Sequence, residues 1–420
     1  MPASTVNGIS FVDALFTSTS AVCVTGLVVL DTAKDFTFFG QAVILLLIQF
    51  GGLGIMTFTI AIISMTGGDF SIQWRFTFES IYNELGKLSI IGILRRILLY
   101  TFTIEILLAA VIFTQFIQTY GFWEAVWHSV FHSISAFCNA GFSTFSDNLI
   151  GYQGNAVVIV SVGIEIILGG LGFVVLTELS RMRLRGLYRF RFWNQFSLHT
   201  RIVLLMTAIL VFGGMFLFMS LEWSYTMKDM SLSTGLLTGF FQSVTCRTAG
   251  FNSVDIGKLR DSTLFIMTAL MFIGGSPGSI AGGIKTTTAA VVTWLLFTKF
   301  MGKHQVTFWG LAIPDDTVDK SVTLTFIALL LISMATFFLL AINGLDRTVR
   351  FLEALFEVTS AFNTVGLSTG ITTKIPATGK LLLVLVMYAG RLGPLTLIAA
   401  LTSRKKDIAI SCAEENIMIG

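Results

Sequence analysis

Charged residues are scarce in this sequence. Asp, Glu, Lys and Arg make up 12% of its 420 residues, about half of the share typical of soluble domains, which excludes a soluble globular fold. The net charge of +3 is too small to favour nucleic-acid binding. The four cysteines (Cys23, Cys138, Cys246 and Cys412) contain no Cys-x-x-Cys pair, so neither a disulfide framework nor a zinc site is indicated.

Hydrophobic residues are abundant instead, at 54% of the chain, which indicates a polytopic membrane protein. A membrane span needs about 20 apolar residues. Runs of this kind lie at 39–64, 94–119, 154–180, 201–221, 262–299, 321–343 and 380–402. The apolar segments of 10 to 14 residues between them suit half-helices that enter the membrane without crossing it. No cleavable signal peptide is predicted, because the first apolar run is short and contains Asp13.

Basic residues are concentrated in alternate linkers, chiefly 64–96 and 181–201, and again at 404–406. The positive-inside rule predicts that these linkers and the C-terminal tail face the cytoplasm, in contact with membrane lipid. The arginine-rich linker 181–201 would also suit a nucleic-acid patch, but its position beside an apolar run favours the membrane surface, and no nucleic-acid partner is expected.

A short motif recurs four times, at 14–27 (ALFTSTSAVCVTGL), 129–142 (SVFHSISAFCNAGF), 239–251 (GFFQSVTCRTAGF) and 354–367 (ALFEVTSAFNTVGL). Each copy has a phenylalanine ten positions before a glycine: Phe16/Gly26, Phe131/Gly141, Phe240/Gly250 and Phe356/Gly366. A second glycine motif follows each copy, at 51–54 (GGLG), 169–172 (GGLG), 274–278 (GGSPG) and 390–393 (GRLG). Such periodicity indicates internal repeats.

Each repeat therefore consists of an apolar span, a half-helix, a glycine turn, an extended segment and a second span kinked at glycines. This is the helix–pore loop–helix unit of potassium channels. The half-helix directs its negative C-terminal dipole into the membrane, and the irregular backbone that follows is tolerated there only where it lines a cavity. Rings of carbonyls from such loops can replace the hydration shell of a cation. We predict an all-α polytopic membrane protein with four pseudo-symmetric repeats around one central ion pore.

The predicted repeats span 1–64, 94–180, 201–300 and 321–402, with a cytoplasmic tail at 403–420. No apolar span precedes the half-helix of the first repeat. The expectation is that the printed sequence begins at an internal methionine and that an outer helix precedes it. Because no Tyr-Asp pair follows the four turn glycines, the pore is expected to select K⁺ over Na⁺ less strictly than a potassium channel does.

The loops VTGL, NAGF, RTAGF and NTVGL, together with GGSPGSIAGGIKTTT and GRLGP, closely resemble the Trk/Ktr/HKT superfamily of cation transporters over essentially the whole chain. The chain length and the tail ending in EENIMIG are most similar to the Ktr-type membrane subunit. This resemblance implies Na⁺-dependent K⁺ uptake at the cell membrane by a symporter-like homodimer. It also implies a cytosolic ring of RCK/KTN-type regulatory subunits that bind ATP or ADP. No cofactor is implied on this chain; K⁺ and Na⁺ are transported or coupling ions.

The resemblance also implies roles for individual positions. The selectivity filter would comprise Val24, Thr25, Gly26, Asn139, Ala140, Gly141, Thr248, Ala249, Gly250, Thr364, Val365 and Gly366. An intramembrane gating loop at 273–285 would comprise Gly274, Gly275, Ser276, Pro277, Gly278, Ser279, Gly282, Gly283 and, at its end, Lys285. The pore-facing arginine below the filter would be Arg391.

Five charged or titratable side chains require individual interpretation. Arg391 either faces the pore or forms an ion pair with a helix carboxylate such as Glu105 or Glu165. Arg247, at the filter of the third repeat, is expected to support the filter from behind by contacting Glu353 or Glu357. Lys285 either tethers the gating loop or extends to the membrane surface. His128 and His132 have zinc-compatible spacing, but they lack a third ligand and are expected to pack near the pore mouth.

The segment 272–288 almost forms a phosphate-binding Walker loop, but Ile284 separates Gly283 from Lys285. A membrane-embedded metal-dependent enzyme is thus disfavoured, because neither an intact Walker loop nor a His/Asp/Glu cluster is present. An inverted-repeat transporter would need two halves of opposite topology, whereas these repeats share one. A less selective Na⁺/K⁺ channel remains the alternative within the favoured class.

Overall fold

The computed structural model describes residues 2–54, 90–181, 193–342 and 348–393. Within these ranges the chain is mostly helical, and its strands are β1 (Thr307–Phe308) and β2 (Leu311–Ala312), which form one antiparallel hairpin with Phe308 opposite Leu311. The predicted tail 403–420, the ends of two predicted spans (55–64 and 394–402) and most of the two basic linkers lie outside the described residues.

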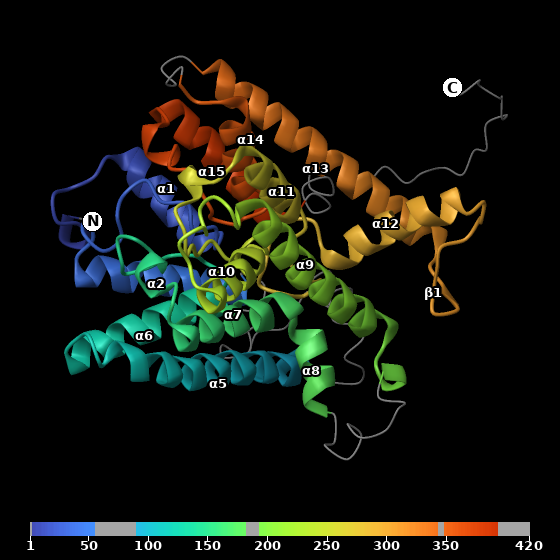
Figure 1. Cartoon of the computed structure of the whole chain (residues 1–420), viewed down its shortest axis with the longest axis horizontal. Coiled ribbons are helices and arrows are strands. Elements are labelled where there is room, and N and C mark those ends of the chain that lie inside the picture. The colour runs from blue at the N-terminus through green and yellow to red at the C-terminus, as the bar shows by residue number, and fades with distance from the viewer. Residues whose placement is uncertain (1, 55–89, 182–192, 343–347, 394–420) are drawn as a thin grey trace.

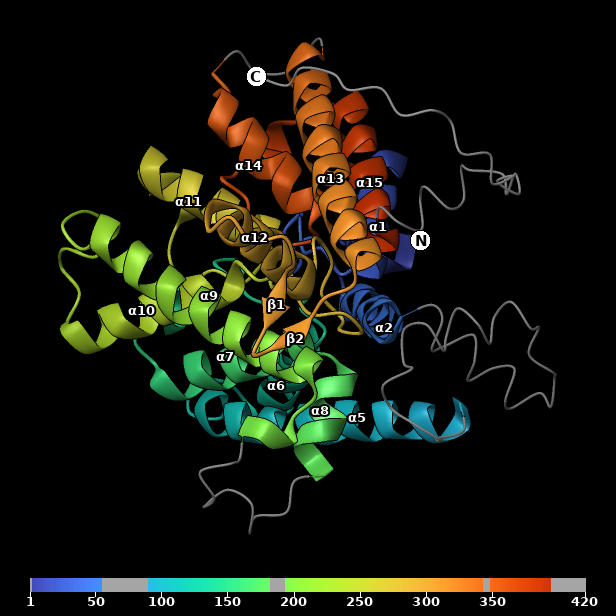
Figure 2. The ribbon, with the colours of Figure 1, turned by 90° about the vertical axis from the view of Figure 1, so that its right-hand side faces the viewer.

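The helices fall into four consecutive groups. The first contains α1 (Phe11–Val22) and α2 (Phe38–Leu53), and the second contains α5 (Ile90–Phe116), α6 (Phe122–Phe137), α7 (Ala156–Leu171) and α8 (Phe173–Arg181). The third contains α9 (Leu198–Glu222), α10 (Leu232–Thr245), α11 (Asp261–Phe272) and α12 (Thr286–Phe300), and the fourth α13 (Asp315–Ala341), α14 (Phe351–Phe362) and α15 (Ala377–Leu392). Figures 1 and 2 show the groups following one another around the molecule.

Single-turn 3₁₀ helices complete the element order. They are η1 (Pro2–Ser4), η3 (Ile150–Tyr152), η5 (Trp193–Gln195), η6 (Ile256–Lys258) and η7 (Thr372–Lys374). Three of them, η3, η6 and η7, lie between the second, third and fourth predicted filter loops and the helices that follow, which are α7, α11 and α15 respectively.

Three helices are long and apolar enough to cross a membrane: Leu94–Phe116 within α5, Leu198–Glu222 and Asp315–Ala341. A fourth candidate is the pair α7 and α8, which bends by 103°. The helix α1 has 12 residues, about 18 Å at 1.5 Å per residue, and is too short to cross the hydrocarbon layer. The prediction of a helical membrane protein is thus confirmed.

Glycines end the helices where the second motif predicted a break. Gly54, Gly172 and Gly393 follow α2, α7 and α15, with φ values of 85°, 88° and 81°. L-residues rarely adopt this conformation, whereas glycine adopts it freely. In the third group the predicted 262–299 run is interrupted, because α11 ends at Phe272 and α12 begins only at Thr286.

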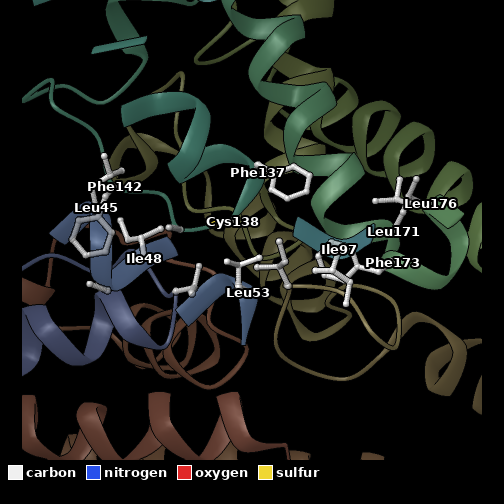
Figure 3. Close-up of a cluster of buried hydrophobic side chains, with 14 of the residues drawn as sticks. Leu45, Ile48, Leu53, Ile97, Phe137, Cys138, Phe142, Leu171, Phe173 and Leu176 are labelled. Carbon is white, nitrogen blue, oxygen red and sulfur yellow. The ribbon is translucent and has the colours of Figure 1, made fainter. Parts of the chain in front are cut away.

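Buried apolar side chains join neighbouring groups. Figure 3 shows one cluster in which Leu45 and Ile48 of α2 lie on the side of Phe142, while Phe137 of α6 lies toward Leu171 and Phe173 at the α7–α8 bend. A second cluster joins α1 to α13, α14 and α15. Dense packing of this kind fixes the loops that the helices carry.

Candidate functional site

Four loops with the same backbone conformation follow the helices α1, α6, α10 and α14. The first filter residue of each has a positive φ: Val24 57°, Asn139 57°, Thr248 63° and Thr364 51°. The glycine two positions later also has a positive φ: Gly26 90°, Gly141 69°, Gly250 76° and Gly366 92°. The residues between them keep a negative φ. Alternating φ signs of this kind direct successive carbonyls toward one side of the chain and the N–H groups toward the other.

The positive φ of the first residue had no signal in the sequence. Val24, Thr248 and Thr364 are β-branched, and such residues strongly disfavour this region, at about 1–3 kcal/mol each. The surrounding structure must therefore impose the conformation.

The four glycines form a closed cycle of close approaches. A Cβ added to Gly26 would lie 2.3 Å from the Ala140 oxygen, and one added to Gly141 would lie 2.7 Å from the Ala249 oxygen. The cycle continues with Gly250, at 2.6 Å from the Val365 oxygen, and returns with Gly366, at 2.1 Å from the Thr25 oxygen. The structure thus brings all twelve predicted filter positions together, each loop against the next.

A cavity of about 560 Å³ opens on the glycine side of these loops and is lined by all four glycines. Its carboxylates are Asp31, Asp35, Asp147 and Asp255, and no lysine, arginine or histidine of the described ranges lines it. Lys34 lies 3.6 Å from Asp31, and Lys258 lies 3.1 Å from Asp255. Even with these two lysines counted, carboxylates outnumber basic side chains at the cavity, which favours cations in front of the loops.

Hydroxyl groups on the four short helices hold the loops. Ser20 Oγ accepts from the Gly26 amide at 3.1 Å, and Ser360 Oγ accepts from the Gly366 amide at 3.0 Å. Ser135 Oγ donates to the Phe142 carbonyl at 2.7 Å, and Thr245 Oγ1 donates to the Phe251 carbonyl at 2.6 Å. Each helix thus fixes its own filter strand.

The third repeat is offset by one residue from the predicted alignment. Phe241 is fully buried like Phe16, Phe131 and Phe356, whereas Phe240 is only half-buried. The helix α10 has its C-cap at Cys246, so Arg247 is an additional residue before Thr248. The predicted pairing of Phe240 with Gly250 is therefore wrong.

The segment 273–285 lies against the opposite side of the filter loops from the cavity. A Cβ on Gly282 would lie 2.2 Å from Thr364 Oγ1, and one on Gly274 would lie 3.2 Å from Thr248 Cγ2. Only small residues fit there. The Gly274 amide donates to the Ile284 carbonyl at 2.8 Å, which closes the base of the segment.

The same segment is attached to the second group of helices. The Ser276 amide donates to the Gly170 carbonyl at 2.9 Å, and the Phe173 amide donates to the Gly278 carbonyl at 3.1 Å. Ser276 Oγ accepts from Thr286 Oγ1 at 3.2 Å. The amides of Gly274, Ser276 and Ser279 are all engaged within the chain, unlike those of a phosphate-binding loop.

Two cations hold the middle of the segment. Arg391 donates to the Ile280 carbonyl and to the Gly51 carbonyl of α2. Lys285 Nζ donates to the neighbouring Ala281 carbonyl at 2.7 Å. Arg391 forms no ion pair within the described ranges, so the alternative in which Glu105 or Glu165 is its partner is wrong.

Those two carboxylates have other partners. Gln49 Nε2 donates to Glu105 at 3.3 Å, and Ser133 Oγ donates to Glu165. Lys285 is half-buried, and its bond to the Ala281 carbonyl lies within the segment itself, so its role as a tether stays a prediction.

Arg247 is buried behind the filter, but the carboxylates predicted as its partners are engaged elsewhere. Glu353 pairs with Arg350 at 2.9 Å, and Glu357 accepts from Ser368 at 3.0 Å. Arg247 Nε and Nη2 have no hydrogen-bond partner among the described residues. Its guanidinium lies near the α7 backbone, 4.0 Å from a Cβ placed on Gly170. The predicted carboxylate contact is wrong, while the filter-supporting role stays a prediction.

The two histidines of α6 are hydrogen-bonded within the chain. His128 Nδ1 contacts Thr144 Oγ1 at 2.7 Å, and His132 contacts the His128 carbonyl at 2.7 Å and Ser143 Oγ at 2.9 Å. In the described part of the chain, no three His, Cys, Asp or Glu side chains are grouped to hold a metal ion. These contacts agree with packing near the pore mouth.

Comparison with known proteins identifies the family. The sequence matches the TrkH family, described as cation transport protein, over residues 4–406. The chain belongs to the TrkH family. Family membership places it among cation transporters rather than enzymes.

Individual relatives cover nearly the whole chain. The Ktr system potassium uptake protein B of Bacillus subtilis is 36% identical over 95% of this chain and 87% of its own length. The potassium/sodium uptake protein NtpJ of Enterococcus hirae is 35% identical over 98% of this chain and 90% of its own length. The crystal structure of the potassium transporter TrkH from Vibrio parahaemolyticus matches with a TM-score of 0.68 and 21% identity, covering 94% of this chain and 79% of that one. This last similarity concerns the fold.

Proposed function

We propose that this chain is the pore-forming subunit of a potassium uptake system. In this proposal four pseudo-symmetric repeats surround one pore, and ions pass through the ring formed by Gly26, Gly141, Gly250 and Gly366. The observation that carries it is the closed cycle of approaches, in which each glycine meets a carbonyl of the next loop and the fourth returns to the first. The relatives' names, potassium uptake protein and potassium/sodium uptake protein, support K⁺ as the transported ion.

The carbonyls of the four loops are the proposed ligands of the permeating ion. Alternating φ signs orient successive carbonyls alike, so that stacked rings of oxygens replace the hydration shell of a cation. The acidic cavity supplies cations from one side. The helix C-termini of α1, α6, α10 and α14 add their negative dipole ends at the loops.

The segment 273–285 is the proposed gate. It lies directly beneath the filter, contacts Thr248 and Thr364, and is held by Arg391 and Lys285. Backbone hydrogen bonds hold it, and its Ile280 and Ile284 side chains pack in buried apolar clusters. Displacing the segment therefore costs these hydrogen bonds, each about 0.5–1.5 kcal/mol, together with the exposure of two isoleucine side chains.

A second candidate function is a less selective Na⁺/K⁺ channel. It is favoured by the name of the Enterococcus relative and by the presence of one glycine in each filter loop rather than two. We expect Na⁺ dependence in either case. The name Ktr system of the Bacillus relative supports a membrane subunit that works with a further component. As that component we propose a cytosolic RCK/KTN-type ring that binds ATP or ADP, and for this chain a homodimer in the cell membrane with its C-terminus in the cytoplasm.

The test is ⁸⁶Rb⁺ and K⁺ flux in proteoliposomes, with and without Na⁺. Gly366→Ser places a side chain against the Thr25 carbonyl at a φ of 92°, so it should change the relative preference for K⁺, Rb⁺ and Na⁺. Deletion of 275–283 should raise the basal flux. Unchanged ion preference in the serine variant would refute the filter, and unchanged flux in the deletion would refute the gate.

A further inference from the structure

One position recurs in all four short helices, directly after the buried phenylalanine. Its residues are Thr17, His132, Gln242 and Glu357, with exposed fractions of 5%, 0%, 1% and 0%. Polar side chains at a fully buried position are costly unless hydrogen-bonded. An apolar residue would fill the same space without that cost. The presence of polar residues at this position therefore suggests that their hydrogen bonds have a role.

In three repeats this residue contacts a serine just beyond the filter glycine. His132 Nε2 lies 2.9 Å from Ser143 Oγ, and Gln242 Nε2 donates to Ser253 Oγ at 3.2 Å. In the fourth repeat, Ser368 Oγ donates to Glu357 Oε2 at 3.0 Å. The side-chain chemistry differs among imidazole, amide and carboxylate, while the connection is the same. We call these three contacts the braces.

The first repeat has no brace. Thr17 is shorter, and its Oγ1 has no hydrogen-bond partner among the residues that the structure describes. The residue two positions beyond Gly26 is Val28, which has no hydroxyl group to offer. Among the described residues, this end of the first filter strand is held by the packing of Leu27 and Val29 and by the contact of Ser20 with the Gly26 amide, without a side-chain brace.

Each brace contacts the strand two or three residues beyond the filter glycine, while the hydroxyls of Ser135, Thr245 and Ser360 contact the glycine itself or the residue directly after it. Two of the braced serines, Ser143 and Ser368, also line the acidic cavity. A carbonyl cage distinguishes cations by the spacing and number of its oxygens. Such a site works only if supporting contacts hold its ligands to within about 0.5 Å.

We propose that His132, Gln242 and Glu357 are positioning residues that set the ion preference of the filter through the braces. The filter strand of the first repeat, which has no brace, is then the one of the four whose carbonyl positions adjust most easily to the bound ion. This inference rests on the proposed filter function.

Glu357 offers the sharpest test, because it accepts from two hydroxyls, those of Ser368 and Thr372. In Glu357→Leu these hydroxyls keep the contact with each other, which measures 2.9 Å, so the substitution removes the brace without isolating its partners. Glu357→Gln is the conservative variant, since Gln242 already makes an equivalent bond in the third repeat. Ser368→Ala removes the brace from its other end.

Glu222 provides a matched control. It is also fully buried and accepts from the hydroxyls of Thr226 and Thr263. It lies at the end of α9 and also accepts from the Arg260 amide, ten residues beyond the filter glycine Gly250. The corresponding control variant is Glu222→Gln.

The experiment is ⁸⁶Rb⁺ uptake by the reconstituted full chain, with competition by Na⁺. Loss of one hydrogen bond should lower the Rb⁺-over-Na⁺ preference about three- to tenfold in Glu357→Leu and Ser368→Ala. The maximal rate per folded protein should stay within about twofold, whereas Glu357→Gln and Glu222→Gln should keep the parental preference. Size-exclusion chromatography quantifies the folded protein of each variant. If Glu357→Leu does not fold, the ion preference of Ser368→Ala tests the inference.

An unchanged preference in the Leu and Ala variants overturns the inference. Equal losses in Glu357→Leu and Glu222→Gln also overturn it, because they would reflect general destabilisation. If Gly366→Ser changes the ion preference while the brace variants do not, the filter proposal is supported and the proposed role of the braces is refuted. If none of them changes it, the filter proposal fails as well.

Discussion

Replacing Arg391 with glutamine should release the segment 273–285. The guanidinium donates one hydrogen bond to the Ile280 carbonyl in that segment and another to the Gly51 carbonyl of α2, and it thereby joins the segment to a neighbouring helix. Glutamine is too short to reach both carbonyls.

The magnitude follows from the bonds lost. A hydrogen bond to a charged group is worth about 1.5–3 kcal/mol, and only the bond to Ile280 holds the segment itself. Taking the lower end of that range, because the site borders water, the open state gains about 1.5 kcal/mol. That change corresponds to roughly a tenfold increase in the open-to-closed ratio.

The assay is basal ⁸⁶Rb⁺ flux into proteoliposomes that contain this chain alone. Arg391→Gln should raise flux about tenfold if the open state is the minor one. Arg391→Lys distinguishes the effect of the two hydrogen bonds from the effect of the positive charge. An ammonium group keeps the charge but cannot bind both carbonyls as a guanidinium does. Flux raised in both variants indicates restraint, whereas flux raised only in the glutamine variant indicates charge repulsion. Arg350→Gln is the control, because Arg350 is exposed and pairs with Asp261 and Glu353. A flux within twofold of the parent in Arg391→Gln would refute the reasoning.

Two further predictions concern the acidic cavity and the contact between the first and last helix groups. Asp147→Asn removes a carboxylate from the cavity. It should raise the apparent KM for Rb⁺ at low ionic strength and have little effect at high salt, because screening removes long-range attraction; an effect independent of salt would contradict this. Asp13 Oδ1 lies 2.6 Å from Lys380 Nζ and joins α1 to α15. Burial alone would raise the pKa of Asp13, but hydrogen bonds from Lys380 and Ser10 outweigh it and hold the pKa below the usual range. Because the folded-state pKa is depressed, the stabilisation exists above the unfolded pKa of about 4 and is lost as the pH falls through the folded value. Asp13→Asn should thus lower Tm at pH 7, and the difference from the parent should shrink below about pH 4; a difference that is constant with pH would argue against the pair.

The glycine motifs made much of the fold predictable. A glycine at a fixed distance after a half-helix and another at the end of the following helix reflect backbone requirements, namely positive φ and close approach. These requirements select glycine at the same positions whatever the surrounding side chains are, so the sequence alone reveals them. The breaks at Gly54, Gly172 and Gly393 and the interruption at 273–285 were therefore accessible before the structure.

Three features were not accessible. The one-residue offset at Phe241 depends on where α10 ends, and a helix end is poorly fixed by a hydrophobic pattern. The positive φ of Val24 opposes the intrinsic preference of valine, so tertiary packing determines it. The partners of Arg391 are backbone carbonyls, which every residue possesses and no sequence pattern marks.

The contact cycle among the four glycine loops has a consequence for how this protein can change. In an assembly of identical subunits, one codon change alters every corner of the ring at once. Here the carbonyls that the glycines meet belong to four separate residues, Thr25, Ala140, Ala249 and Val365, encoded at four separate places. A single mutation therefore alters one corner and leaves three intact, so the ring can diverge stepwise after gene duplication.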